Sequence, residues 1–116
     1  MPLQCGLHEM SIAASVLDAL HAEAAAHPGA SVTRAGLRIG ELSGVEPESL
    51  RFCLTAVAPE IAFELEIAPW TRRCRACGRT FAVCDALTAC PHCASSETER
   101  GGGDEIELTF LELEQP

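Results

Sequence analysis

Cys74-Arg75-Ala76-Cys77, followed by Cys90-Pro91-His92-Cys93 twelve residues later, forms a pair of matched Cys-x-x-Cys motifs. Each motif presents two sulfurs to one metal ion, and two motifs supply the four tetrahedral thiolates of a structural zinc site. Such a closed shell has no open position for water or a substrate, so it indicates a structural metal. Gly78, directly after the first motif, permits the left-handed backbone that these turns need. The sequence therefore predicts a segment that folds around a metal ion.

Neither redox chemistry nor simple burial accounts for the cysteines as well as a metal does. A redox dithiol pair lacks the βαβ context of a thioredoxin-like protein, and unconnected buried cysteines would not recur at matched spacing. The chain has seven cysteines, an odd number that argues against a disulfide framework. Cys84 and His92 lie in the same segment and could replace a ligand, but we expect a packed thiol and an exposed imidazole. Cys53 falls on an apolar helical stripe and is expected in the core.

The charge of the chain changes around these motifs. Residues 70–96 hold four Arg against one acid, whereas residues 1–69 hold three against nine and residues 97–116 one against seven. We interpret residues 70–96 as a zinc-ribbon-like module, whose arginines offset thiolate charge, inserted into an α+β domain of residues 7–69 and 97–116. Residues 1–6 are an N-terminal extension. The run Gly101-Gly102-Gly103 predicts a flexible joint on the return to the domain.

Hydrophobic periodicity predicts two helices and three strands in the α+β domain. Apolar residues recur at helical spacing over residues 9–27 and 47–58, and the second segment opens on an acidic, Pro-led start. Apolar and polar residues alternate over residues 31–42, 63–67 and 106–110. The expected fold is therefore two helices on a small three-stranded sheet. Since the module separates the last two strands, we expect those two to be antiparallel neighbours.

The overall charge and hydropathy exclude several classes of partner. The net charge of -9 would repel nucleic acid and anionic membranes. No apolar run is long enough to span a membrane. A secretory signal would need a positively charged start, but no Lys or Arg precedes Arg34. We expect a cytoplasmic protein. It has no phosphate loop, no paired general acid and base, and no nucleophile with a visible partner, so we expect a protein that is not an enzyme.

Several motifs together resemble one known family. The stretch His8-Glu9-Met10-Ser11-Ile12 precedes the first helix, and Ile39-Gly40-Glu41-Leu42-Ser43-Gly44-Val45 precedes Pro47-Glu48-Ser49-Leu50-Arg51-Phe52. With the paired cysteine motifs and the closing strand at Glu105-Ile106-Glu107-Leu108, this order is similar to that of the hydrogenase-maturation nickel metallochaperones, the HypA/HybF family.

The resemblance implies two metal sites and a set of partners. Zinc would be held by Cys74, Cys77, Cys90 and Cys93, and nickel near the N-terminus by His8, with Glu9 as a ligand or beside the ligands. The nickel would be delivered to the large subunit of a nickel–iron hydrogenase together with a hydrogenase-maturation GTPase. The resemblance leaves monomer and homodimer open. The alternative is a zinc-ribbon adaptor that docks on another macromolecule through its arginines and handles no nickel.

The start of the chain departs from the family pattern. Leu7 occupies the position of the family's initial Met, so the terminal amine that the family offers to nickel is not adjacent to His8. Either the mature chain begins at position 7, or the extension stays and Cys5 supplies a thiolate instead. We expect the first arrangement, because extra residues would crowd a site that closes on the chain end.

Overall fold

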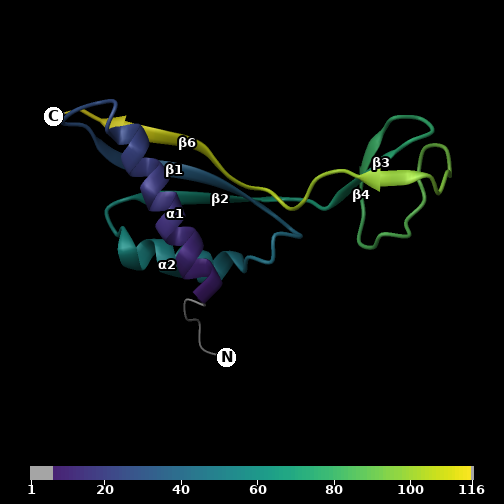
Figure 1. Cartoon of the computed structure of the whole chain (residues 1–116), viewed down its shortest axis with the longest axis horizontal. Coiled ribbons are helices and arrows are strands. Elements are labelled where there is room, and N and C mark those ends of the chain that lie inside the picture. The colour runs from purple at the N-terminus through teal and green to yellow at the C-terminus, as the bar shows by residue number, and fades with distance from the viewer. Residues whose placement is uncertain (1–6, 116) are drawn as a thin grey trace.

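The computed structural model describes residues 7–115 and consists of two lobes joined by a narrow neck (Figure 1). The large lobe carries a three-stranded sheet with two helices, and the small lobe carries a second three-stranded sheet. No described helix has the length and apolar character that crossing a membrane requires. The elements in chain order are α1 (Leu7–Ala24), β1 (Ser31–Gly40), α2 (Pro47–Val57), β2 (Ala62–Ala68), β3 (Thr71–Cys74), β4 (Thr80–Ala82), β5 (Thr98–Arg100) and β6 (Ile106–Glu114).

Both helices form where the periodicity predicts them, with one change that matters for function. Helix α1 begins at Leu7 rather than near Glu9, so His8 lies in the first helical turn instead of before it. It ends at Ala24, three residues earlier than expected, because the Ala26 and His27 N–H groups bond to the carbonyls three residues before them and so tighten the chain into turns ahead of Pro28. Helix α2 is capped by Glu46, whose carboxylate accepts a 2.6 Å hydrogen bond from the Ser49 backbone N–H. That bond lowers the pKa of Glu46.

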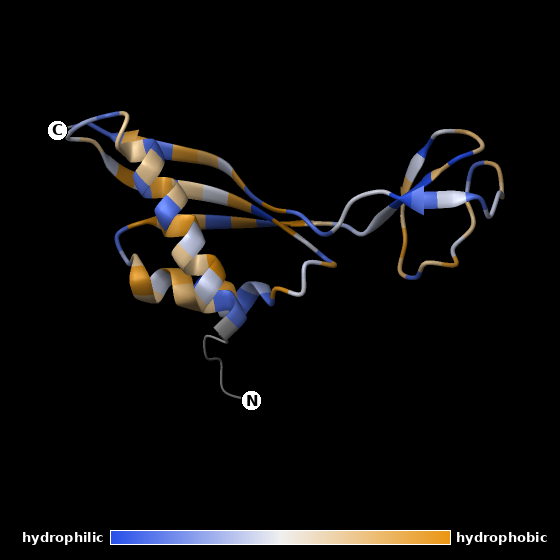
Figure 2. Ribbon diagram, viewed as in Figure 1, coloured by the Kyte–Doolittle hydropathy of each residue, from blue (hydrophilic) through white to orange (hydrophobic). Residues whose placement is uncertain are grey.

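The core of the large lobe lies between the helices and one face of the sheet. Its fully buried side chains come from α1, β1 and α2. Hydrophobic residues recur along both helices and the strands of this lobe (Figure 2). Cys53 is among them, as expected from its place on the α2 stripe. Because the chain has few aromatic residues, aliphatic side chains supply this core, principally Leu20, Leu37, Ile39, Leu50 and Leu54.

The strand order corrects one expectation. Strands β2 and β6 are not neighbours, because β1 lies between them in the order β2-β1-β6. Strand β2 pairs with β1 in parallel, which requires a crossover, and α2 provides it. Strand β6 pairs with β1 antiparallel on the other side. The central position suits β1 because its side chains Ala35, Leu37 and Ile39 are fully buried. A central strand has a neighbouring strand along each of its two edges, which helps to exclude water from its residues.

Charged side chains cover the face of this sheet that points away from the helices. Arg34 on β1 forms ion pairs with Glu64 on β2 and with Glu112 on β6, so one guanidinium links all three strands. The same guanidinium lies 5.0 Å from the ring centroid of Phe110. Arg38 pairs with Glu66 at 3.1 Å. We call this surface the open face; it is polar, and its arginines are neutralised by acids from the neighbouring strands.

The neck, residues 69–70 and 101–105, is a hydrogen-bonded structure and not a free joint. The Thr71 N–H donates to the Gly102 carbonyl at 2.9 Å, and the Trp70 N–H donates to the Glu41 carboxylate at 2.7 Å. Gly103 has φ +124°, and a Cβ there would lie 2.7 Å from the Trp70 Cα. The glycines therefore allow two chain passages to approach closely. The expectation that residues 101–103 form a flexible joint is wrong. At Gly101 and Gly103 a side chain would collide with the neighbouring backbone, so glycine is needed there.

The second sheet also extends further than the expected module. Its order is β4-β3-β5, and β5 pairs with β3 through Arg73 and Glu99. Because β5 spans residues 98–100, the small lobe continues beyond residue 96. The charge change at residue 97 that suggested the boundary arises from acids that pair with the arginines of the same lobe.

We expect Gly40→Ala to destabilise the chain by about 3 kcal/mol, because its Cβ would lie 2.1 Å from the Gly103 carbonyl oxygen, a backbone atom that cannot move away alone. Gly102→Ala is the matched control, since the nearest atom to its Cβ is 3.4 Å away. Chemical unfolding followed by circular dichroism measures both. Equal stabilities of the two variants would contradict a tightly packed neck.

Candidate metal centre

The two Cys-x-x-Cys motifs fold into equivalent turns. In the first turn the Gly78 N–H donates to the Cys74 carbonyl at 2.9 Å, and in the second the Ala94 N–H donates to the Cys90 carbonyl at 2.8 Å. Both residues after the motifs have a left-handed backbone, with φ +79° at Gly78 and +64° at Ala94. The expected role of Gly78 is confirmed. Ala94 performs the same role without the freedom of glycine, which a motif search does not reveal.

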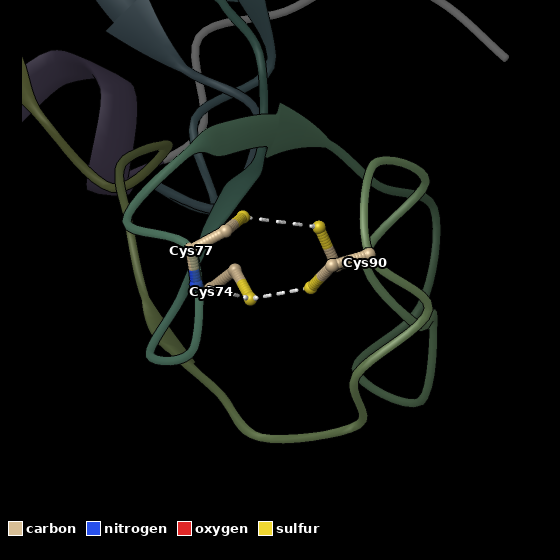
Figure 3. Close-up of side chains that lie close together, drawn as sticks. Cys74, Cys77 and Cys90 are labelled. Carbon is tan, nitrogen blue, oxygen red and sulfur yellow. Dashed lines mark hydrogen bonds between the residues drawn. The ribbon is translucent and has the colours of Figure 1, made fainter.

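The four sulfurs converge on one point. All lie within 4.8 Å of one another, and the shortest approaches cross between the turns, 3.5 Å from Cys74 to Cys93 and 3.7 Å from Cys77 to Cys90. Figure 3 shows Cys77 and Cys90 facing each other across the lobe. Four thiolates around Zn(II) at the usual bond length stand about 3.8 Å apart. The cluster thus fits a tetrahedral metal site, and no rearrangement of the backbone is required.

The surroundings of the cysteines favour thiolates unequally. The Cys77 backbone N–H donates to the Cys74 sulfur at 3.4 Å and is the largest cause that lowers the pKa of Cys74 to about 6. A backbone bond from Ser95 favours the Cys93 thiolate, but the neighbouring Cys74 sulfur and burial outweigh it and raise the pKa of Cys93 to about 12. In the folded lobe the Cys74 thiol therefore ionises more readily than the Cys93 thiol, and a metal that binds all four sulfurs must displace the Cys93 proton.

The arginines of the small lobe bond to groups other than these sulfurs. Arg73 and Arg75 form ion pairs with Glu99, at 2.8 Å and 3.4 Å, and Arg72 donates to Thr98. Arg79 bonds the ring of His92 at 2.9 Å. The cysteine sulfurs instead take backbone N–H groups and other cysteines as partners. The turns therefore supply the direct hydrogen bonds to the sulfurs, and the offset of thiolate charge by the arginines remains a prediction about the net charge of the lobe.

Two further residues of the small lobe, His92 and Cys84, lie outside the four-sulfur cluster. His92 is exposed, as expected. Cys84 is exposed rather than packed. It lies in the loop after β4 with Leu87, whose side chain is 92% exposed. The buried core of this lobe is small, consisting of two of the cluster cysteines and Phe81, so a metal ion bound at the cluster would add much to its stability.

His8 and Glu9 lie in the other lobe, in the first turn of α1. His8 is exposed and Glu9 half-buried. Within residues 7–115 the four cysteines form the one group of three or more candidate His, Cys, Asp or Glu ligands, so no such group of side chains from this range gathers at His8. His8 does line a groove of about 480 Å³ between α1 and β6, whose other lining residues include Ser15, Ala19 and Leu108. Sequence periodicity gives no signal for this groove.

The arrangement of a four-cysteine lobe beside an α+β lobe is shared with known proteins. A family model described as hydrogenase/urease nickel incorporation, metallochaperone, hypA, matches residues 7–113. The chain belongs to the HypA family. A relative from Chlorobium limicola, named hydrogenase maturation factor HypA, is 37% identical, with 94% of this chain and 98% of the relative covered. A relative of the same name from Prosthecochloris aestuarii is 39% identical, with 93% and 100% covered.

Solved structures of HypA proteins share the fold. The solution structure of the Ni metallochaperone HypA from Helicobacter pylori matches with a TM-score of 0.63 at 18% identity, covering 93% of this chain and 98% of that one. A second solution structure of a HypA protein matches with a TM-score of 0.65 at 20% identity, covering 96% and 99%. The expected α+β fold with two helices, a three-stranded sheet and a four-cysteine lobe is confirmed for this HypA-family chain.

The left-handed residues allow a test of the turns. Replacing Ala94 by Gly removes a backbone cost of about 1 kcal/mol and, because folding and metal binding are coupled, should tighten Zn(II) binding about fivefold. Gly78→Ala introduces the same cost and should weaken binding by a similar factor, since its Cβ would have space, with Arg73 3.8 Å away. Competition with a chromophoric chelator measures both affinities. A change of the same sign in the two variants would refute the equivalence of the turns.

Proton release provides a second test. Four thiolates are needed, so zinc affinity falls as pH falls. At about pH 7.5 Cys74 is already ionised and binding should release fewer than four protons, whereas at about pH 5.5 its proton must also leave and the number should rise. Titration calorimetry in buffers of different protonation enthalpy counts the protons. Cys84→Ser, outside the cluster, is the control and should not change the count. Equal proton release at the two pH values would contradict the lowered pKa of Cys74.

Proposed function

We propose that this chain is a nickel metallochaperone, which binds Ni(II) through His8 and delivers it during maturation of a nickel–iron hydrogenase. The observation that carries the proposal is the match of residues 7–113 to a family described by hydrogenase and urease nickel incorporation. That match begins at the turn of α1 that holds His8 and Glu9. Nickel is cargo in this proposal, so its site must be accessible, and His8 is exposed.

The first turn of α1 has the donors that Ni(II) requires. The first four backbone N–H groups of a helix have no intrahelical acceptor, so Ni(II) that displaces their protons to solvent and binds their nitrogens would break no helical hydrogen bond. With the His8 imidazole they offer the nitrogen donors that favour square-planar Ni(II). Glu9 follows directly and supplies a carboxylate as a ligand or beside the ligands. Because the helix end is anchored by Ala13 and Val16 in the core, these donors stand on a rigid element.

We further propose that Cys74, Cys77, Cys90 and Cys93 hold structural zinc. The support is the chemistry of the donor set: four sulfurs at tetrahedral spacing leave no position for water. Zinc bound there stabilises the small lobe, whose own buried core is slight, and it takes no part in nickel exchange. The chain thus acts by binding and transfer and catalyses no reaction.

The partners follow from the same proposal. They are the large subunit of a nickel–iron hydrogenase and a hydrogenase-maturation GTPase, both in the cytoplasm, where the hydrogenase acquires its metal. The chain acts as a monomer or homodimer. The competing function, a zinc adaptor without nickel transfer, draws support from the exposed Leu87 in the small lobe. Metal content separates the two functions.

The purified protein should bind one Ni(II) and one Zn(II) per chain. His8→Ala should abolish nickel binding while leaving zinc in place, because the two sites lie on different lobes. His21→Ala, in the last turn of the same helix, is the matched control and should bind nickel normally. Elemental analysis after dialysis gives both contents. One zinc and no nickel in the wild-type protein would favour the adaptor.

A variant in which Met directly precedes His8 addresses the ligand set. Its terminal amine stands next to His8, so it should bind Ni(II) at least as tightly as the full chain, and Cys5→Ala in the full chain should leave the affinity unchanged. Nickel titration followed by visible absorption measures the affinities. Tighter binding by the full chain, lost in Cys5→Ala, would instead assign a thiolate to the site.

A further inference from the structure

Strand β6 leaves one long edge free. It pairs with β1 on one side, and no other described strand pairs with its outer side. With nine residues it is long for an edge strand, and it carries neither proline nor glycine to blunt that edge. Its outer N–H and C=O groups can therefore pair with another extended chain.

The groove beside this edge gives such a chain an apolar side. It lies between α1 and β6, and Ile12, Val16, Leu37, Ile106 and Leu108 are among its lining residues. Ser15 and Ala19 form its α1 wall and are exposed. Where an added strand pairs with residues 106–108 of β6, alternate side chains would lie over this groove. Because His8 lines the same groove, the added strand would pass beside the proposed nickel site.

The opposite side of the same strand would meet negative charge. Glu107 lies at the rim of the groove, among its lining residues, and also faces Arg38 of the open face across the β1–β6 register, but Arg38 pairs with Glu66 instead. Within residues 7–115 the Glu107 carboxylate has no ion pair. Glu112, further along β6, forms an ion pair with Arg34, which also pairs with Glu64, so two carboxylates face one guanidinium. Side chains of an added strand that point to the open face would therefore be favoured if they are basic.

We propose that the outer edge of β6, together with the groove along α1, is the docking site for an extended segment of the client protein that accepts nickel, whose side chains alternate between apolar and basic. The apolar side chains lie in the groove and the basic ones beside Glu107. This rests on the proposed function only in naming the client; the surface itself is defined by backbone, groove and charge.

A second copy of this chain is a poorer occupant. If two β6 strands paired edge to edge, the acidic side chains of both open faces would lie on the same face of the joined sheet. Like charges across a strand pair destabilise it. The acidic strand thus disfavours its own copy while favouring a basic strand of another protein.

The test uses the full chain and a fluorescein-labelled nine-residue peptide that alternates Val and Lys. Fluorescence anisotropy should detect binding, and amide exchange should slow at residues 106–114. Two methylated peptides test strand pairing: one carries N-methyl groups on every Val, the other on every Lys. Since alternate N–H groups of a strand point to one edge, one of these peptides should lose at least tenfold in affinity and the other should bind nearly normally.

Matched variants test the two sides of the peptide. Ser15→Trp fills the groove and should weaken binding at least tenfold, whereas Ala14→Trp adds the same side chain to an exposed position of α1 outside the groove and should not. Glu107→Arg should weaken binding about fivefold. Glu60→Arg makes the same charge change in the turn before β2, away from β6, and should have little effect.

The same variants then apply to the purified, metal-free large subunit of the hydrogenase. Ser15→Trp should weaken its binding at least tenfold while nickel content stays at the wild-type level. Equal effects of the two methylated peptides, equal effects of Ser15→Trp and Ala14→Trp, or dimers through β6 would each overturn the proposal. If His8→Ala removes nickel but Ser15→Trp leaves client binding intact, the metallochaperone function stands and this docking site falls. If the peptide docks as expected but the protein binds no nickel, the docking site stands and the metallochaperone function falls.

Discussion

The connection between the two lobes depends on one close contact between backbones in the neck, that of Gly40 with Gly103. Gly40 ends β1, the central strand of the large sheet, and Gly103 lies on the return path from the small lobe; a Cβ on Gly40 would overlap the Gly103 carbonyl. The Gly40 N–H also donates to the Glu105 carbonyl at 2.7 Å, so the contact continues the β1–β6 ladder into the neck. This contact sets where β6 starts and therefore how it pairs with β1.

The lobes themselves are stabilised by different means. The large lobe buries aliphatic side chains from two helices and the central strand, so it has a core of its own. The small lobe has a buried cluster of Cys74, Phe81 and Cys90, and both cysteines belong to the metal cluster. The paired turns pre-form its sulfur positions, and zinc, as proposed, would add the stability that this small core lacks. Loss of that zinc should therefore destabilise one lobe without removing the core of the other.

In the proposed function, this division separates two kinds of metal chemistry. The cysteine cluster is closed and rigid, which suits an ion that stays. The His8 end of α1 is open to solvent and stands beside a groove and an unpaired strand edge, which suits an ion that is passed on. A client strand on β6 would reach the metal without disturbing the cluster, because the two surfaces belong to different lobes (Figure 1).

Local sequence patterns are enough for the elements of the large lobe and for the cysteine cluster. Alternation in β1, helical stripes in α1 and α2, and matched cysteine spacing each reflect short-range geometry, and all appear in the structure. The start of α1 is misplaced by two residues because helix ends carry weak signals. The place of β2 and β6 on either side of β1, the addition of β5 to the small lobe, and the close packing at Gly40 and Gly103 required the tertiary structure. They depend on which distant backbones meet, and neither periodicity nor motif spacing encodes a contact between segments far apart in the sequence.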